Sequence, residues 1–356
     1  MIYSLTAFSL FLASLYCTSK YRRRENITLC FLLAFFWLVL YEGLRWQIGT
    51  DWDSYYKFFD GEENAHMGLA YGAMNHFLKG LTGSFSVVQI AVSLFFYLAF
   101  FNLVRRYSPN IFMSLVLCYC SMIGFLGCNR QLLALTFCIF SLFFLFKHKT
   151  SLYVLFVLLA SLFHITAIVF FAAYFLYKWR PSNMVIIGAL AFALVIGASH
   201  VINKLPFATL LSALDAASSG QTSLSSYVDS FEGGMSVVGV LKRLAIVSAA
   251  IYARKFIKRP KYDFFLKMYL VGCVIFFVFN GSVLQLMAGR GAMYFNIFEA
   301  LVIPYIITYI PATKATKYVA WAVVFAVYFY LMWRDMNSYV VMTGEDIYNP
   351  YRSVLF

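Results

Sequence analysis

Long apolar runs separated by short polar segments dominate the chain. Each run is about 20 residues long, the length that an α-helix needs to cross the hydrocarbon core of a bilayer. The pattern predicts an all-α, polytopic integral membrane protein with about ten full transmembrane helices. We expect one membrane domain over residues 1–356. The predicted spans are residues 2–18, 27–44, 86–104, 111–127, 131–146, 183–203, 237–252, 264–287, 291–310 and 318–333.

One further apolar run, residues 152–177, has two interpretations. As a single helix it would be about 39 Å long at about 1.5 Å per residue, and it would reverse the side on which every later segment lies. A re-entrant helical hairpin, bent between Ser161 and His164, keeps the basic residues at both of its ends on one side. Such a break is tolerated where it lines a cavity. We favour the hairpin, with His164 at its tip.

The basic residues indicate how the spans are oriented. Most of the 28 Lys and Arg residues fall in clusters between alternate spans, at residues 20–24, 105–106, 147–149, 178–180, 254–261 and 314–317. Clusters of this kind face the cytoplasm, so both termini are predicted to lie outside. The predicted external segments are residues 45–85, residues 204–235 and a C-terminal tail, residues 334–356.

Composition agrees with a membrane protein and excludes other classes. Charged residues make up 12% of the chain, against roughly a quarter in soluble domains. The net charge of +13 is concentrated in the orientation clusters, so we expect no nucleic-acid partner. The seven cysteines lie almost entirely in apolar runs and form no C-x-x-C pair, so we expect no disulfide, no metal and no other cofactor.

Four arginines do not fit the orientation rule, because they lie inside predicted spans or at their outer ends. They are Arg45, Arg130, Arg243 and Arg290. A charge at the bilayer centre costs about 2.5 to 3.5 kcal/mol or more, so such residues usually line a protein cavity. Guanidinium groups bind phosphate oxygens through paired hydrogen bonds, and the four together predict a site for a phosphate-rich anion.

An alternative interpretation of each arginine is structural. A single arginine can extend to the membrane interface or pair with a nearby carboxylate. Arg45 could pair in this way with Asp51, and Arg290 with Glu299. For any one arginine, the structural and the binding interpretation are equally open.

His164 and Asp51 are the candidate general bases. A structural histidine that hydrogen bonds to a carbonyl freed by the hairpin bend explains His164 equally well. The sequence Asp51-Trp52-Asp53 resembles the D-x-D metal motif of soluble glycosyltransferases, but its surroundings do not form a nucleotide-binding fold. We therefore expect Asp51 to act as an orienting or pairing carboxylate without a metal.

Four motifs, taken together and in order, resemble the EpsG-like group of Wzy-type polysaccharide polymerases. They are R-x-x-I-G-T-D-x-x-x-Y (residues 45–55), G-C-N-R-Q-x-L-A (127–134), L-A-S-L-F-H-x-T-A (159–167) and R-x-x-x-Y-F (290–295). The resemblance implies a glycosyltransferase of the bacterial inner membrane, with its active site facing the periplasm or the cell exterior. Such an enzyme joins undecaprenyl-pyrophosphate-linked oligosaccharide units of an O-antigen of lipopolysaccharide, a capsule or an exopolysaccharide.

The resemblance also implies roles for the candidate residues. An acceptor sugar hydroxyl would attack the donor's anomeric carbon, and undecaprenyl pyrophosphate would leave. Arginines would stabilise the charge on the leaving group, and His164 or Asp51 would take the acceptor's proton. The expected ligands of the pyrophosphate are Arg130 and Arg290 first, then Arg45 and Arg243; the expected substrate-positioning residues are Gln131, Tyr294 and Tyr55.

Two other functions fit the same residues. A flippase or transporter of the lipid-linked oligosaccharide would also place arginines in a cavity, but such proteins usually have repeated halves, and the sequence has no visible repeat. An O-antigen ligase performs similar chemistry on a different acceptor. For the polymerase, the expected partners are the lipid-linked oligosaccharides, membrane lipid, a flippase and a chain-length regulator.

Overall fold

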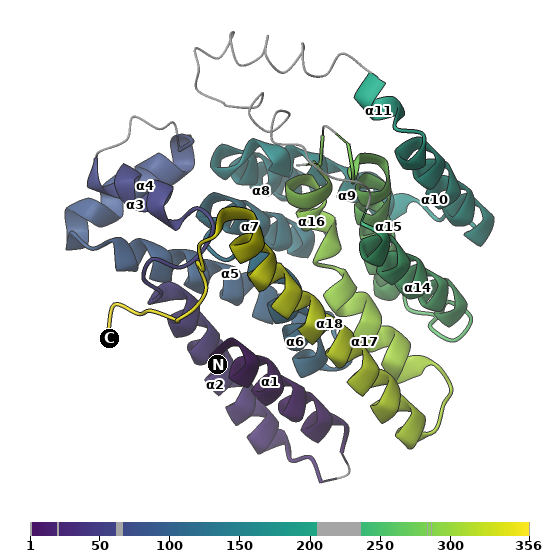
Figure 1. Cartoon of the computed structure of the whole chain (residues 1–356). Coiled ribbons are helices and arrows are strands. Elements are labelled where there is room, and N and C mark those ends of the chain that lie inside the picture. Colours follow the sequence, from purple (N-terminus) through teal and green to yellow (C-terminus); the bar gives the residue numbers. More distant parts are fainter. Residues whose placement is uncertain are drawn as a thin grey trace. The chain divides into compact units, whose positions relative to one another are not determined.

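The computed structural model of the chain describes residues 2–19, 21–61, 67–204, 236–282, 284–285 and 287–355 (Figure 1). Every regular element within these ranges is a helix, in agreement with the predicted all-α class. The contacts divide the chain into two compact units, Met1–Ile168 with Ile303–Phe356, and Val169–Val302. Each unit is described by itself, and the single membrane domain stays a prediction.

The first unit is built around α7. This helix packs against α5 and α8, while α2 packs against α5, and both α1 and α18 pack against α6. Capping side chains fix where some of these helices begin: Asn110 accepts a hydrogen bond from the Met113 amide at 3.1 Å at the start of α6. The helices of the unit are α1 (Ile2–Thr18), α2 (Arg24–Gly43), α3 (Trp52–Asp60), α4 (Leu69–Thr82), α5 (Phe85–Tyr107), α6 (Ile111–Met122), the 3₁₀ turn η1 (Ile123–Phe125), α7 (Asn129–Leu145), α8 (Thr150–Phe163) and α18 (Lys314–Thr343).

The second unit is built around α15 (Pro260–Phe279), which contacts α9, α10, α14, η3 and α16. Gly272 allows the close approach of α16, because a Cβ atom there would lie 2.5 Å from Asn296 Oδ1. The other helices are α9 (Ala172–Lys178), α10 (Asn183–Ala198), α11 (Val201–Lys204), α14 (Val237–Ala253), the π-helical turn η3 (Met287–Gly291), α16 (Met293–Asn296) and the start of α17 (Glu299–Tyr309). The predicted external segment 204–235 lies, from residue 205 onward, outside the described residues.

Four helices in the described part of the chain are long and apolar enough to cross a membrane: α2, α5, α15 and residues Lys314–Ser338 of α18. A fifth results if Met287–Asn296 and Glu299–Tyr309, which meet at 48°, form one broken span. The other apolar helices have 10–17 residues. The predicted number of spans and the orientation of the termini stay predictions.

The ambiguous run 152–177 is broken at the predicted place. Helix α8 ends at Phe163, and His164 has an extended backbone with φ −152° and ψ 119°. The 3₁₀ helix η2 (Ile165–Phe171) and then α9 follow. One continuous α-helix over this run is therefore ruled out, while the folding back of its two halves stays a prediction.

Two predicted external segments contain more helix than their polarity suggests. Residues 45–85 hold α3 and α4, which end at Gly61 and Gly83, both in the left-handed conformation. Helix α18 continues to Thr343 and ends at Gly344, so the non-helical part of the predicted tail begins only there. Beyond Gly344 the chain returns to the end of α2.

Candidate functional site

The first two motifs touch through a pair of glycines. Gly49 and Gly127 have φ values of +107° and +104°, which residues with a side chain rarely adopt. A Cβ atom on Gly49 would lie 2.3 Å from the carbonyl oxygen of Leu126, and one on Gly127 would lie 3.1 Å from the Gly49 Cα. The two backbones can meet only because both residues are glycine. We call residues 44–50 the Arg45 loop; it is held at the N-terminal end of α7.

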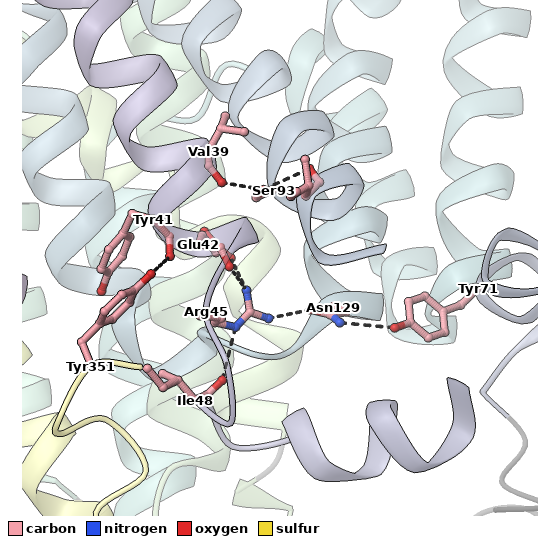
Figure 2. Close-up of polar contacts among 10 residues, drawn as sticks. Val39, Tyr41, Glu42, Arg45, Ile48, Tyr71, Ser93, Asn129 and Tyr351 are labelled. Carbon is pink, nitrogen blue, oxygen red and sulfur yellow. Dashed lines mark hydrogen bonds and ion pairs between the residues drawn. The ribbon is translucent and has the colours of Figure 1, made fainter. Parts of the chain in front are cut away.

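Arg45 lies at the centre of this contact and is 1% exposed (Figure 2). Its Nε donates to the Ile48 carbonyl at 3.2 Å, its Nη1 donates to the Glu42 carbonyl at 2.5 Å, and its Nη2 donates to Asn129 Oδ1 at 2.9 Å. The Glu42 carboxylate lies 4.0 Å from Nη1. The guanidinium group therefore links the end of α2, its own loop and α7.

Further polar contacts surround Arg45 on two sides. Asn129 donates through Nδ2 to the Tyr71 hydroxyl of α4 at 3.2 Å, and burial raises the pKa of that phenol. Gln89 of α5, with its amide oriented to satisfy both neighbours, donates to the Arg45 carbonyl at 2.9 Å and accepts from Trp52 Nε1 at 3.0 Å. This geometry favours the structural interpretation of Arg45, although its carboxylate neighbour is Glu42 and not Asp51.

Arg130 lies at the start of α7, and its guanidinium group makes fewer hydrogen bonds to the described residues than that of Arg45. It is half-buried, and its backbone N–H and its Nε both donate to the Tyr55 hydroxyl at 3.4 Å. Its guanidinium carbon lies 5.9 Å from the centre of the Tyr55 ring. Within the described ranges, its two terminal amino groups have no hydrogen-bond partner. Tyr55 thus orients Arg130 and leaves the donors best suited to a phosphate available.

Tyr55 is 3% exposed and remains a neutral phenol. Burial raises its pKa above the ordinary value of 10.0; the neighbouring Arg130 lowers the pKa, and Asp51 raises it. Asp51 is half-buried, stands directly before α3 and does not cap that helix with its side chain. Asp53 is exposed and pairs with Lys57 at 2.7 Å. The two carboxylates of the D-x-D sequence are therefore in different surroundings.

The third motif reaches the second through His164. Its Nε2 lies 3.3 Å from Gln131 Nε2, and its Nδ1 lies 2.6 Å from Thr166 Oγ1. If the Gln131 amide donates to Nε2, then Nδ1 carries the proton and donates to Thr166, as in a neutral histidine. Gln131 is 2% exposed, and its Oε1 has no partner among the residues the structure describes. Both ring nitrogens of His164 thus face protein groups.

The second unit holds the remaining candidates, beginning with Arg243 on α14. It is 8% exposed, its guanidinium carbon lies 3.5 Å from the centre of the Phe276 ring, and its Nη1 donates to the Gly239 carbonyl at 3.1 Å. The neighbouring Lys242 donates to both carboxylate oxygens of Glu299 at 3.2 Å. Glu299, which the sequence offered as a partner for Arg290, is therefore engaged by Lys242.

Arg290 lies in the π-helical turn η3 and is half-buried, and Tyr294 follows in α16 with 0% exposure. Single π-helical turns occur frequently at functional sites. The structure thus assigns the predicted site residues to two units. Arg45, Asp51, Tyr55, Arg130, Gln131 and His164 belong to the first unit, and Arg243, Arg290 and Tyr294 belong to the second.

Comparison with known families places the chain in a family. The model of the EpsG family matches residues 27–353, a range that includes all four motifs. The chain belongs to the EpsG family. The family indicates a polysaccharide-polymerase type of function, and together with the apolar helices it indicates a membrane protein. Searches of curated proteins and of solved structures gave no match.

Several residues of this candidate site were not expected from the sequence. Asn129 stands inside the second motif, where its position between Cys128 and Arg130 was a usable signal. Tyr71 and Gln89 lie outside all four motifs, and nothing in the local sequence marks them. Among the described residues, no three His, Cys, Asp or Glu side chains are grouped as metal ligands.

Proposed function

We propose that this EpsG-family protein joins undecaprenyl-pyrophosphate-linked oligosaccharide repeat units at the outer face of the bacterial cytoplasmic membrane. The proposal rests on the hydrogen bonding of the Arg130 guanidinium group. Its Nε is held by Tyr55, while its terminal amino groups are available to a ligand. A half-buried guanidinium in this state is suited to binding the oxygens of a lipid pyrophosphate.

In the proposed reaction one carbon–oxygen bond forms and another breaks. A hydroxyl oxygen of the acceptor sugar bonds to the anomeric carbon of the donor glycan, and the bond from that carbon to the pyrophosphate oxygen breaks. Arg130 stabilises the negative charge that develops on the departing pyrophosphate, often the largest contribution to such catalysis. Arg290 and Arg243 remain phosphate-ligand candidates from the sequence, and Tyr294 remains a candidate positioning residue.

The acceptor's proton needs a base, and Asp51 and His164 are both candidates. The Asp51 carboxylate is half-buried and stands directly before α3, the helix that carries Tyr55. His164 has Gln131 on one ring nitrogen and Thr166 on the other, so its action as a base requires one of these contacts to open. A positioned base typically contributes about 10² to 10⁴ in rate, which Asp51→Asn would remove.

The experiment that tests the proposal is a gel of surface glycan from cells producing Arg130→Ala or Arg130→Lys. The matched control is Arg334→Ala, because Arg334 lies on α18 outside the four motifs and pairs with its neighbour Asp335 at 2.9 Å. We expect Arg130→Ala to accumulate to the normal level and to reduce the ladder to single repeat units. Arg130→Lys keeps the charge but loses the paired donors, so we expect short chains.

The same gel separates the polymerase from a ligase. Single units that remain attached to the acceptor indicate lost polymerisation, whereas loss of all attached glycan indicates a ligase. A flippase requires a second measurement, extraction of the cell's lipids, in which accumulated lipid-linked single units on the cytoplasmic side indicate lost transport. An unchanged ladder in Arg130→Ala contradicts the proposed role of Arg130.

A further inference from the structure

The chain after α18 returns to the Arg45 loop and pairs with it. Three backbone hydrogen bonds join the two segments: Trp46 N–H to the Arg352 carbonyl at 3.0 Å, Val354 N–H to the Leu44 carbonyl at 3.0 Å, and Gly49 N–H to the Ile347 carbonyl at 3.3 Å. An isolated antiparallel bridge also links Arg45 and Ser353. The C-terminal segment, residues 344–355, thus supplies backbone partners to a loop that forms no helix of its own.

Two tyrosines anchor the C-terminal segment. Tyr351 donates to the Tyr41 carbonyl at 2.6 Å (Figure 2), and its ring stacks on the Tyr41 ring with 5.1 Å between the ring centres. Tyr348 is 1% exposed; its carbonyl accepts from the Tyr3 hydroxyl at 2.8 Å, and its own hydroxyl donates to the Ile123 carbonyl at 3.4 Å. The segment is therefore fastened to α1, to α2 and to the turn before α7.

The C-terminal segment contacts the part of the chain that orients Arg130. The Arg45 loop meets Gly127 through Gly49 and leads directly into α3, which carries Tyr55. Tyr55 in turn accepts both hydrogen bonds from Arg130. Loss of the C-terminal segment would remove three backbone partners from the loop and leave its neighbours in place.

We propose that residues 344–355 act as a positioning strap, which holds the Arg45 loop against the start of α7 and thereby sets the geometry of Tyr55 and Arg130. Tyr348 and Tyr351 are positioning residues, since they act through the loop. The consequence of the strap for glycan synthesis rests on the proposed function, but its effect on the loop does not.

A native thiol reports on the loop independently of activity. Cys128 is 3% exposed and lies beside the contact between Gly49 and Gly127, with its Sγ 3.6 Å from Thr50 Oγ1. Cys138 lies further along α7 and is 0% exposed. A loosened loop would open Cys128 to reagent and leave Cys138 covered, whereas general unfolding would open both.

The experiment compares the full chain with a chain that ends at Thr343, each carrying Cys128 or Cys138 as its sole cysteine. The measurement is the rate of reaction with a small maleimide in native membranes. We expect the truncation to speed labelling of Cys128 at least about tenfold and to leave labelling of Cys138 unchanged.

A synthetic peptide of residues 344–356, added in trans, should slow the labelling of Cys128 again. In the full chain, Tyr351→Ala should reproduce part of the effect and Tyr351→Phe less, because phenylalanine keeps the stacking.

The outcomes separate the two proposals. Unchanged labelling of Cys128, or equal acceleration at Cys138, overturns the strap. Faster labelling of Cys128 alone supports the strap, and a shortened glycan ladder in the same cells then supports the proposed function as well. Faster labelling of Cys128 with a normal ladder keeps the strap and counts against the role of this loop in polymerisation.

Discussion

Arg45 and Arg130 lie in neighbouring motifs, but their guanidinium groups differ in burial and in hydrogen bonding. The guanidinium of Arg45 is fully buried and bonded to Glu42, Ile48 and Asn129. That of Arg130 has one nitrogen on Tyr55 and two terminal amino groups without a partner in the described part of the chain. A buried donor set that is bonded internally stabilises the fold, whereas available donors at a half-buried position can bind a ligand.

This difference predicts unequal losses of stability for the same substitution at the two positions. Arg45→Met leaves buried acceptors on Ile48, Glu42 and Asn129 without their donor. Each such group costs about 1 to 3 kcal/mol, so we expect a loss of at least about 3 kcal/mol in the free energy of unfolding. Arg130→Met removes the Nε hydrogen bond to the Tyr55 hydroxyl, which still accepts from the backbone N–H of residue 130, and we expect a loss of less than about 2 kcal/mol. Thermal melts of the detergent-solubilised variants measure both; equal melting temperatures would contradict the assignment.

Tyr55→Phe tests the orientation of Arg130 without removing any charge. The ring remains beside the guanidinium, but the acceptor for its Nε is gone. Since small misplacements of a catalytic group can cost about 10²-fold, we expect a turnover between about 10- and 100-fold lower with stability nearly unchanged. The assay is in vitro polymerisation of lipid-linked units.

The pH dependence of that assay is a control on the same residue. Burial, the largest cause, raises the pKa of Tyr55 above 10.0, so the hydroxyl stays protonated through neutral pH in the folded protein. The mutant and the parent should therefore show profiles of the same shape between about pH 6 and pH 9. A profile that loses its alkaline limb in Tyr55→Phe would mean that the phenol titrates in this range.

At the scale of elements, the sequence motifs predicted which segments matter but not how they meet. The spacing in R-x-x-I-G-T-D and G-C-N-R-Q marked Gly49 and Gly127 as members of short motifs. It contained no information that the two glycines face each other, because that contact joins residues 78 positions apart, as for the Thr50–Cys128 pair beside it. The C-terminal segment was equally hidden, since its main bonds are made by backbone groups, which every sequence carries.

The contact between Gly49 and Gly127 gives a prediction with a matched control. Gly49→Ala introduces a Cβ atom 2.3 Å from the Leu126 carbonyl oxygen at a φ of +107°. Gly61→Ala has the same kind of backbone strain, with φ +95°, but its Cβ meets none of the described residues within 4 Å. Strain alone costs about 1 to 2 kcal/mol, so we expect Gly61→Ala to be tolerated and Gly49→Ala to lower stability further and to shorten the glycan ladder. Similar melting temperatures and ladders for the two variants would mean that the loop can shift away from α7.

At the scale of the whole molecule, hydropathy predicted the class and the apolar segments but not where they break. His164 interrupts an apolar run, residues 152–177, that by length and hydropathy alone could form a single helix. The bend at His164 was found only because the positions of the basic clusters required it. The structure also adds a constraint that no local pattern contains. The hydroxyl of Tyr3 donates to the carbonyl of Tyr348, so the start of α1 and the C-terminal segment lie at the same end of the first unit.

Because the start of α1 and the C-terminal segment lie at the same end of the first unit, the predicted orientation can be tested at two positions. The Arg45 loop, Arg130 and the C-terminal segment lie together, while Lys149 follows the far end of α7, a helix of 17 residues that is about 25 Å long. Because the basic cluster at residues 147–149 is predicted to face the cytoplasm, Glu345 must face outward.

In a background without other cysteines, Glu345→Cys should react with a membrane-impermeant maleimide in intact cells. Lys149→Cys, which is also exposed, should react only after the membrane is opened. The reverse pattern would place Arg130 on the cytoplasmic side, away from the lipid-linked units that the proposed reaction requires, and would reject the polymerase while leaving the strap intact.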